Sequence, residues 1–220
     1  MSEPGDLLPR SFFARPAHEV APGLLGHVLV SGDGRDAVAL RITEVEAYEG
    51  GEDPASHGWR GRTPRNASMF GPPGHLYVYR IYGMHHAANL VCGREGESHA
   101  VLVRAGEVIV GQVVAAGRRP AARSRTELAR GPGRLADALA ITHALDGADI
   151  CDPESPVRVT RARPVERDRI LSGPRTGVSR AHDVSWRFWT AGDPTVSPYR
   201  RHTPRRRREA APPEPGGREA

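Results

Sequence analysis

Residues 63–92 decide the fold, and they read TPRNASMFGPPGHLYVYRIYGMHHAANLVC. Two runs within this stretch, 76–82 and 87–92, are rich in the aliphatic and aromatic residues that favour strands. Gly83 stands between the runs, and glycine readily adopts the backbone conformations of a tight turn or a kink. We therefore predict a β-hairpin whose tip lies near residue 83.

Three of the five tyrosines of the chain lie in the first strand of this hairpin. Tyr77 and Tyr79 share one face because side chains alternate along a strand, whereas Tyr82 has the opposite parity and neighbours Gly83. The shared face fits a tyrosine-rich strand packed on the core, and it equally fits a surface on which nucleic-acid bases stack. A tyrosine at a hairpin tip has less reason to belong to the core, so Tyr82 is a candidate wedge between base pairs.

A second strand is predicted over residues 37–46, where alternating apolar and polar residues indicate a half-buried strand. At its end, Glu44, Glu46 and Tyr48 share one face. Two acids and a tyrosine are rarely core, so this face is either exposed to solvent or part of a functional site. The following residues, 49–75, predict a long loop, and a loop of that length in a compact domain is usually functional.

The rest of the chain mixes short strands with helical segments in an irregular order, which predicts the α+β class. Further strands are expected within residues 24–30, 100–104, 157–160 and 186–189. A helical pattern spans residues 126–145, and its interruption at residues 131–133 is a candidate start for a second helix.

A length of 220 residues fits one domain with a sizeable core. We expect this domain to span residues 11–202. A loose leader at residues 1–10 would precede it, and a disordered tail rich in Arg and Pro would follow at residues 203–220.

Charge is segregated along the chain. The formal net charge is +5, and all 31 basic residues are arginine. Residues 36–57 carry a local net charge of −5, whereas residues 58–94 carry five arginines and no acid. Such clustering occurs by chance on solvated surfaces, but it also fits an anionic pocket beside a surface for phosphates. The lack of lysine excludes a lysine Schiff base and a lysine-containing phosphate loop.

Several other classes of protein are disfavoured by the sequence. No run approaches 18 apolar residues, and the N-terminal residues do not resemble a secretory signal. Cys92 and Cys151 lack the spacing of a metal site, and the adjacent His85 and His86 would point to opposite faces of a strand. We therefore expect a reduced cytoplasmic protein without a metal or another cofactor, associated with the nucleoid if it is bacterial.

Several motifs occur in the order found in one known family: LLGHVLV, ITEVEAYEG, DPASH, the stretch from Thr63 to Asn89, AVLVRAGEV, GPGRLADALAI and RTGVS. Over residues 11–198 the chain resembles the alkyladenine (3-methyladenine) DNA glycosylase family. The resemblance implies one domain around a curved antiparallel sheet, with flanking helices and a protruding hairpin that carries Tyr82. It also implies a monomeric, monofunctional glycosylase of base excision repair. Such an enzyme flips an alkylated or deaminated purine out of double-stranded DNA and hydrolyses the N-glycosidic bond, which leaves an abasic site.

The resemblance implies roles for individual residues of the reaction site. Glu46 falls on the catalytic base that activates the attacking water, and Arg104 falls on the arginine that holds this water and the carboxylate. Tyr48, His57 and Tyr79 fall on the aromatic walls of the base pocket. Aromatic faces attract cations, so these walls would favour N-alkylated purines.

Other residues are implicated in the recognition of DNA. By resemblance, Asn89 falls on the residue that obstructs the amino group of normal guanine, and Tyr82 falls on the wedge that fills the gap left by the flipped base. Arg60, Arg65 and Arg80 are candidates for phosphate contacts on the grounds of charge alone.

Two alternatives stay open at this point. The chain could retain the fold as a nucleic-acid-binding protein that has lost catalysis, or it could be a metal-dependent hydrolase that uses Glu46 and His57. A catalytically dead member of the family would be expected to lose Glu46, Tyr48 or Arg104, and all three are present.

Overall fold

The computed structural model describes residues 6–81 and 83–203, and it has a mixed α+β fold, as predicted. The helices are α1 (Arg10–Phe13), α2 (Ala17–Leu24), α3 (Gln112–Arg118) and α4 (Pro132–Ala138). The strands are β1 (Val28–Ser31), β2 (Val38–Glu49), β3 (Leu76–Ile81), β4 (His85–Cys92), β5 (His99–Val110), β6 (Val157–Thr160), β7 (Ile170–Gly173) and β8 (Arg187–Thr190). None of the helices in this described part of the chain is long and apolar enough to cross a membrane.

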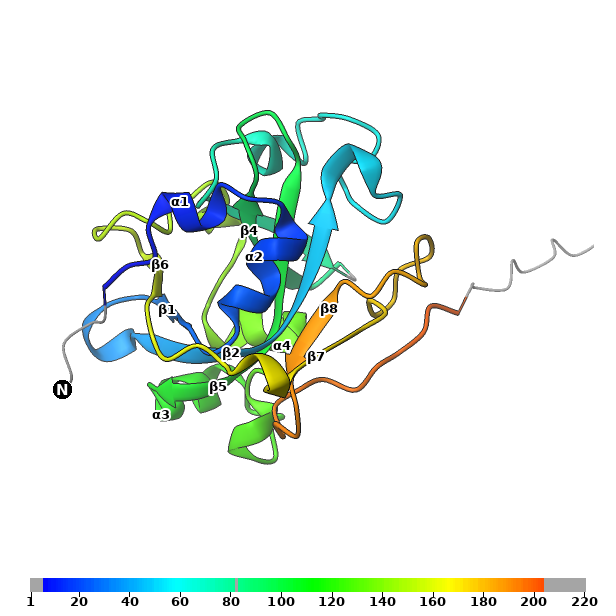
Figure 1. The fold of residues 1–220 in the computed structure, drawn as a ribbon. Helices are drawn as coiled ribbons and strands as arrows, with labels where there is room; N and C mark the ends of the chain where they lie inside the picture. Colours follow the sequence, from blue (N-terminus) through cyan, green and yellow to red (C-terminus); the bar gives the residue numbers. More distant parts are fainter. Residues whose placement is uncertain (1–5, 82, 204–220) are drawn as a thin grey trace, which may run out of the picture.

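The strands form one curved antiparallel sheet in the order β3-β4-β5-β2-β1-β6 (Figure 1). The long strand β2 organises this sheet, because β5 pairs with it along one edge while β1 and β8 divide the other edge. The β8 pairing covers residues 44–46 of β2, and β7 adds to the outer edge of β8. The two candidate carboxylates therefore lie on a strand that has hydrogen-bonded neighbours on both sides.

The β-hairpin predicted from residues 63–92 is confirmed. Strands β3 and β4 pair from Leu76 opposite Leu90 to Ile81 opposite His85, at the end of the strand order. Gly83 has a φ of 76°, in the left-handed region that favours glycine. The side chain of Met84 at the tip is 73% exposed. The predicted wedge residue next to this glycine, residue 82, lies outside the described residues.

Helices cover the sheet and complete the core. Helix α2 packs on β2 and β5, and α4 packs on β4 and β5, so that mostly small aliphatic side chains fill the interior. In Figure 1, the blue helices α1 and α2 lie across the front of the sheet. Glycine and proline hid α2 from the sequence analysis, since Pro22 and Gly23 lie inside it and Pro16 precedes it. The predicted second helix, in contrast, does open at Pro132.

The expectation of a half-buried β2 is wrong. Every residue from Ile42 to Ala47 is buried, including Glu44 and Glu46, each with an exposed fraction of 0%. Strand β2 lies against α2, and two later segments of the chain hydrogen-bond the carboxylates, so neither face of the strand reaches solvent. The solvent-exposed alternative for the acidic face is therefore wrong, and the functional alternative stays a prediction.

The predicted leader differs from the structure in its last residues. Leu7 forms an isolated β-bridge with Thr160, Leu8 is 1% exposed, and Arg10 pairs with Asp149. Residues 7–10 therefore pack on the domain, because Leu8 joins the apolar core there. Residues 1–5 and 204–220 lie outside the described residues, and so does nearly all of the tail that was predicted to be disordered.

Candidate active site

A cleft of about 1530 Å³ opens beside the buried carboxylates. Its lining includes the predicted residues of the base pocket and the arginine predicted to hold the water. These are Tyr48, His57, Tyr79, Asn89 and Arg104. The cleft is also lined by residues that the sequence analysis did not single out, among them Arg130, Arg134, Thr176 and Arg200. The fold thus brings residues from the first strands, from α4 and from the last loops to one cavity.

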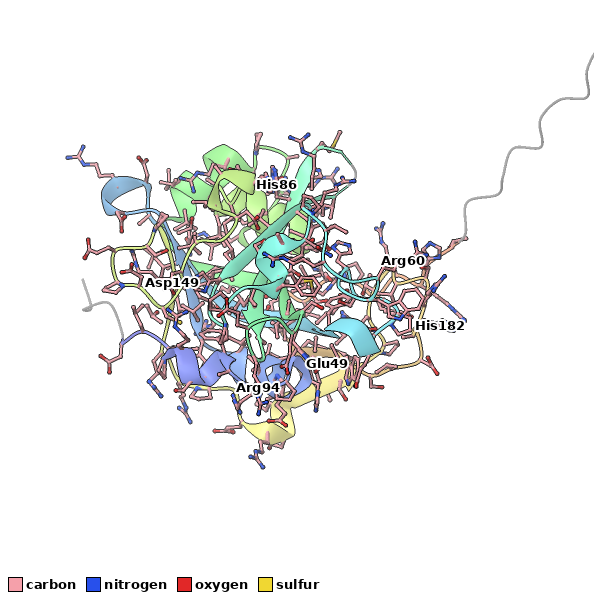
Figure 2. All side chains as sticks on the ribbon, turned by 90° about the horizontal axis from the view of Figure 1, so that it is seen from above. Glu49, Arg60, His86, Arg94, Asp149 and His182 are labelled. Atoms are coloured by element: carbon pink, nitrogen blue, oxygen red, sulfur yellow. The ribbon has the colours of Figure 1, made fainter. Side chains whose placement is uncertain are left out.

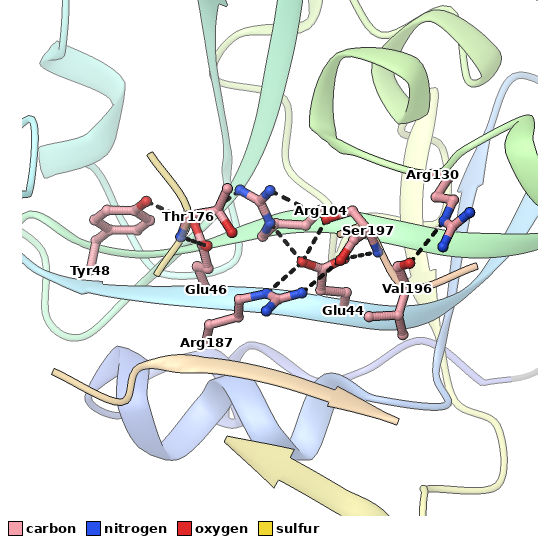
Figure 3. Close-up of polar contacts among 9 residues, drawn as sticks. All are labelled: Glu44, Glu46, Tyr48, Arg104, Arg130, Thr176, Arg187, Val196 and Ser197. Atoms are coloured by element: carbon pink, nitrogen blue, oxygen red, sulfur yellow. Dashed lines mark hydrogen bonds and ion pairs between the residues drawn. The ribbon is translucent and has the colours of Figure 1, made fainter. Parts of the chain in front are cut away.

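The carboxylate of Glu46 is hydrogen-bonded to three residues that line this cleft (Figure 3). Its Oε2 accepts hydrogen bonds from the Tyr48 hydroxyl at 2.9 Å and from Nη1 of Arg104 at 3.2 Å. Its Oε1 accepts a hydrogen bond from the backbone N–H of Thr176 at 2.6 Å. All three donor residues line the cleft, and a carboxylate has about four acceptor sites, so one site remains for another donor such as water.

Glu44 is the second buried carboxylate of the site, and it binds the loop that contains Ser197. Its Oε1 accepts hydrogen bonds from Nε of both Arg104 and Arg187 at 2.8 Å, and its Oε2 accepts one from the backbone N–H of Ser197 at 2.6 Å. Burial would raise the pKa of Glu44, but the charges of Arg104 and Arg187 and the Ser197 hydrogen bond lower it below its ordinary value. Glu44 therefore stays ionised and holds Arg104 in position.

Arg104 connects the two carboxylates, since its Nε donates to Glu44 and its Nη1 donates to Glu46. Burial would lower the pKa of Arg104, but Glu46 and Glu44 raise it, so the guanidinium stays charged. A third buried carboxylate, Asp53, pairs with Arg175. Together with Arg187, these residues are three acids and three arginines, whose charges sum to zero when every group is ionised.

Aromatic rings form one wall of the cleft. The ring centroids of His57 and Tyr79 are 4.3 Å apart, those of Tyr77 and Tyr79 are 5.5 Å apart, and the Tyr77 hydroxyl lies 3.0 Å from Nδ1 of His57. His57 keeps an exposed edge, but its partial desolvation beside the tyrosines and the charge of Arg65 lower the pKa of the imidazole, which favours its neutral form. The core interpretation of the tyrosine face holds for Tyr77, which is buried. Tyr79 is half-buried at the cleft, and the stacking of bases on it stays a prediction.

Tyr48 connects the wall to the carboxylate. Its hydroxyl donates to Glu46, and burial together with the negative charge of Glu46 raises the pKa of this hydroxyl well above its ordinary value. The hydroxyl therefore keeps its proton and acts as a donor. Behind the ring lies Arg175, whose Cζ is 4.6 Å from the ring centroid.

The remaining predicted residues lie at or outside the cleft. Asn89 is buried at its wall, where Nδ2 donates to the backbone carbonyl of Tyr77 at 3.0 Å. Arg60, Arg65 and Arg80 are exposed and do not belong to the cleft lining. Figure 2 shows Arg60 at one end of the molecule, on the same side as His182.

Sequence reasoning missed the groups that come from the end of the chain. Arg175 and Thr176 belong to the turn-rich segment 173–177, and Ser197 lies in a loop without a regular element. Strand β8 was expected, but nothing in its pattern indicated that Arg187 would reach Glu44. The backbone N–H of Thr176, which the sequence analysis did not single out, donates to Glu46. In the described part of the chain, no group of three or more His, Cys, Asp or Glu residues is placed to hold a metal ion.

The site therefore combines a buried carboxylate, a charged arginine and a planar aromatic wall in one large cleft. This arrangement is typical of an enzyme that binds a flat ring system and acts on a bond beside it. A buried, hydrogen-bonded carboxylate beside an aromatic cleft favours an enzyme over a binding module with an apolar groove.

Comparison with known proteins specifies the class. Residues 11–194 match the family model described as methylpurine-DNA glycosylase. The chain is 59% identical over 203 residues to a protein of Streptomyces avermitilis named "Putative 3-methyladenine DNA glycosylase", with 91% of this chain and 95% of the relative covered. Proteins of the same name from Frankia casuarinae and Nocardia farcinica are 50% identical over 196 residues and 52% identical over 185 residues. These matches cover 84% and 81% of this chain and 90% and 84% of the respective relatives.

The chain belongs to the methylpurine-DNA glycosylase family. It is therefore a DNA-repair enzyme of the hydrolase class that acts on N-glycosidic bonds. The family predicted from the sequence motifs is confirmed. The roles of single residues, the flipping of the base and the range of substrates stay predictions.

Proposed function

We propose that this enzyme flips an alkylated purine out of duplex DNA into the described cleft and hydrolyses its N-glycosidic bond with a water activated by Glu46. The carboxylate behind the cleft lining supports this proposal most directly. Three fixed donors orient it, and one acceptor site remains for the proton of a water. Its negative charge would also stabilise the cationic sugar that develops as the base departs.

Arg104 and Thr176 hold the catalytic group in place in this proposal. A general base accelerates a reaction only when its lone pair points at the proton to be removed, and the two N–H donors restrict the rotation of the carboxylate. Arg104 is itself fixed by the ionised Glu44. The Tyr48 hydroxyl adds a third restraint from the side of the base.

The aromatic wall supports the choice of an N-alkylated purine as substrate. A positively charged ring is attracted to the faces of Tyr48 and Tyr79 by about 0.5–2 kcal/mol per contact, an advantage that normal adenine lacks. The cationic base is also the better leaving group. Asn89 stays the proposed obstacle to the amino group of guanine, since its side chain is held in the wall by the Tyr77 carbonyl.

The surface around the cleft supports duplex DNA as the partner. Arg130, Arg134 and Arg200 line the opening, and Arg60 lies beyond it with its guanidinium 5.8 Å from the Trp59 ring centroid. These cations suit the phosphates on either side of a flipped nucleotide. Arg65 and Arg80 are further candidates on exposed surface, and Tyr82 stays the proposed wedge at the hairpin tip.

Release of free base from alkylated DNA tests the proposal. Duplex DNA treated with dimethyl sulfate is incubated with the purified protein in EDTA, and the released bases are identified by mass spectrometry. We expect methylated purines in solution and abasic sites that break only after alkali. DNA binding without base release would favour the non-catalytic alternative, and activity abolished by the chelator would favour a metal-dependent hydrolase.

A further inference from the structure

A buried guanidinium, that of Arg175, lies against the ring of Tyr48, whose hydroxyl donates a hydrogen bond to Glu46. The Arg175 side chain is 1% exposed, and its Cζ lies 4.6 Å from the ring centroid of Tyr48 and 5.2 Å from that of Trp186. Arg175 is not among the residues that line the cleft, whereas Tyr48 and Thr176 are. The guanidinium therefore covers a face of Tyr48 that is turned away from the cleft.

Asp53 pairs with this guanidinium in the interior through both of its carboxylate oxygens. Nη2 of Arg175 donates to Oδ1 of Asp53 at 2.8 Å, Nη1 donates to Oδ2, and Nη1 also donates to the backbone carbonyl of Ala47 at 2.9 Å. The carboxylate is fixed in turn, since Oδ1 accepts a hydrogen bond from the N–H of Ala55 at 3.0 Å and Oδ2 accepts one from the N–H of Glu49 at 3.3 Å. A two-fold ion pair of this kind is both strong and geometrically specific.

A cation behind an aromatic ring affects what the ring can bind on its other face. Aromatic faces attract cations, but two cations on opposite faces of one ring repel each other. With an effective dielectric constant of about 20 and a separation of about 8 Å, an uncompensated charge behind Tyr48 would weaken the binding of a cationic base about 30-fold. The same charge would leave a neutral base almost unaffected.

The opposite wall of the base pocket follows the same pattern. His57 stands next to Tyr79, and the lowered pKa of its imidazole favours the neutral form. Arg104 is compensated by Glu44 and Glu46. Beside Tyr48 and Tyr79, the described part of the chain thus places an imidazole whose neutral form is favoured and two arginines that pair with carboxylates.

We propose that Asp53 determines the preference of the enzyme for positively charged bases, because it neutralises Arg175 behind Tyr48 and leaves the front face of that ring free to attract a cation. Arg175 keeps a positioning role, since it packs on the ring and precedes the N–H donor of Thr176 in the chain. Neither Asp53 nor Arg175 lines the cleft. This inference rests on the proposed function and adds a residue that selects among the substrates.

The test compares a cationic lesion with a neutral lesion in the same enzyme. Single-turnover rates are measured on duplexes that contain 7-methylguanine and on duplexes that contain either hypoxanthine or ethenoadenine, whichever the wild-type protein releases faster. The ratio of the two rates cancels any general loss of active protein. We expect Asp53→Asn to lower this ratio about tenfold or more. We expect the double variant D53N/R175M, which removes both charges, to restore the ratio to within about threefold of the wild type.

Asp149→Asn is the matched control, because it also removes a carboxylate that pairs with an arginine, here Arg10. In Figure 2, Asp149 lies on the other side of the molecule from Arg60, a candidate contact for DNA. Its ratio should equal that of the wild type. If Asp53→Asn fails to fold, Arg175→Met provides the opposite test. It leaves the carboxylate alone behind the ring, so the ratio should rise, and a fall would overturn the proposal.

Equal losses on both lesions in Asp53→Asn would show a purely structural role and would also overturn the proposal. Such a result would leave the proposed function intact, since the wild-type protein would still release bases. Failure of the wild-type protein to release any base would instead refute the proposed function itself.

Discussion

Replacement of Glu46 by glutamine tests whether Glu46 is the general base, and it also lowers the stability of the protein by a predictable amount. The side chain keeps nearly the same shape, but one acceptor oxygen becomes an NH₂ donor. In the wild type, both oxygens of Glu46 accept, one from the Thr176 N–H and the other from Tyr48 and Arg104. Either orientation of the amide therefore places a donor against a donor, which costs about 1–3 kcal/mol.

The effect on the reaction should exceed the effect on stability. A positioned general base contributes about 10²–10⁴-fold to the rate, which corresponds to about 3–5 kcal/mol of transition-state stabilisation. The amide cannot accept the proton of water, and it carries no charge to stabilise the sugar cation. We expect the single-turnover rate to fall at least 100-fold and the melting temperature to fall by about 2–12 °C.

The assay uses excess enzyme on alkylated duplex DNA at 25 °C, with binding measured separately by fluorescence anisotropy. Glu107→Gln is the matched control, because Glu107 lies on β5 with a side chain that is 47% exposed and pairs only with Arg41 among the ion pairs of the described residues. It should keep the wild-type rate and change stability by less than about 1 kcal/mol. If Glu46→Gln binds DNA and retains more than about a tenth of the wild-type rate, the assignment of the base is wrong.

Three further predictions concern the rest of the network. Arg104→Met leaves Glu44 and Glu46 buried without their shared cation, so urea unfolding should show a loss of about 3–5 kcal/mol, and unchanged stability would contradict the network. The hydrogen bond to Glu49 raises the pKa of His99 despite the burial of the ring. The stabilisation that comes from protonated His99 should therefore be complete below about pH 6.5 and lost as the pH rises through the higher pKa of folded His99. Burial would raise the pKa of Glu49, but hydrogen bonds from His99 and His18 lower it to about 2, so the stabilisation from Glu49 should be lost as the pH falls from about 4.5 towards 2. When the urea midpoint is plotted against pH, His99→Gln should flatten the alkaline side of the curve. Because the chain has no lysine, borohydride added during turnover should trap no lysine-linked adduct with DNA, and an adduct or a nick without alkali would refute hydrolysis by water.

The sequence was informative wherever neighbours in the chain determine the structure. The alternation of residues 76–82 places Tyr77 and Tyr79 on one face, and Gly83 permits the turn that follows, so the hairpin could be predicted from local rules. Helix α2 could not be predicted in this way. Pro22 normally ends a helix, and here the burial of Val20, Ala21 and Leu24 in the core outweighs that local preference.

The partners of the carboxylates could not be predicted from local patterns at all. Thr176 supplies a backbone N–H, which every residue type except proline has, so its identity carries no signal. Arg175 and Asp53 lie 122 residues apart, and only the folded chain shows that they pair. The motifs of the family resemblance are specific enough to predict roles for Glu46 and Arg104, which the structure brings into contact. The charge pattern alone left the acidic face open between solvent and function.

The distance along the chain between Glu44 and its last donor has a consequence for synthesis in the cell. Ser197 follows Glu44 by 153 residues, and Thr176 follows Glu46 by 130 residues. At translation rates of about 5–20 residues per second, roughly 8–30 s separate the synthesis of Glu44 from that of Ser197. Until residue 176 has been made, a nascent chain on the ribosome holds two carboxylates without their closing loops, and Glu44 lacks its Ser197 donor until the interval ends. The site is therefore completed only after residue 197 has been made, and chains released before residue 176 would lack the Thr176 donor to Glu46 as well as the Arg187 and Ser197 contacts to Glu44.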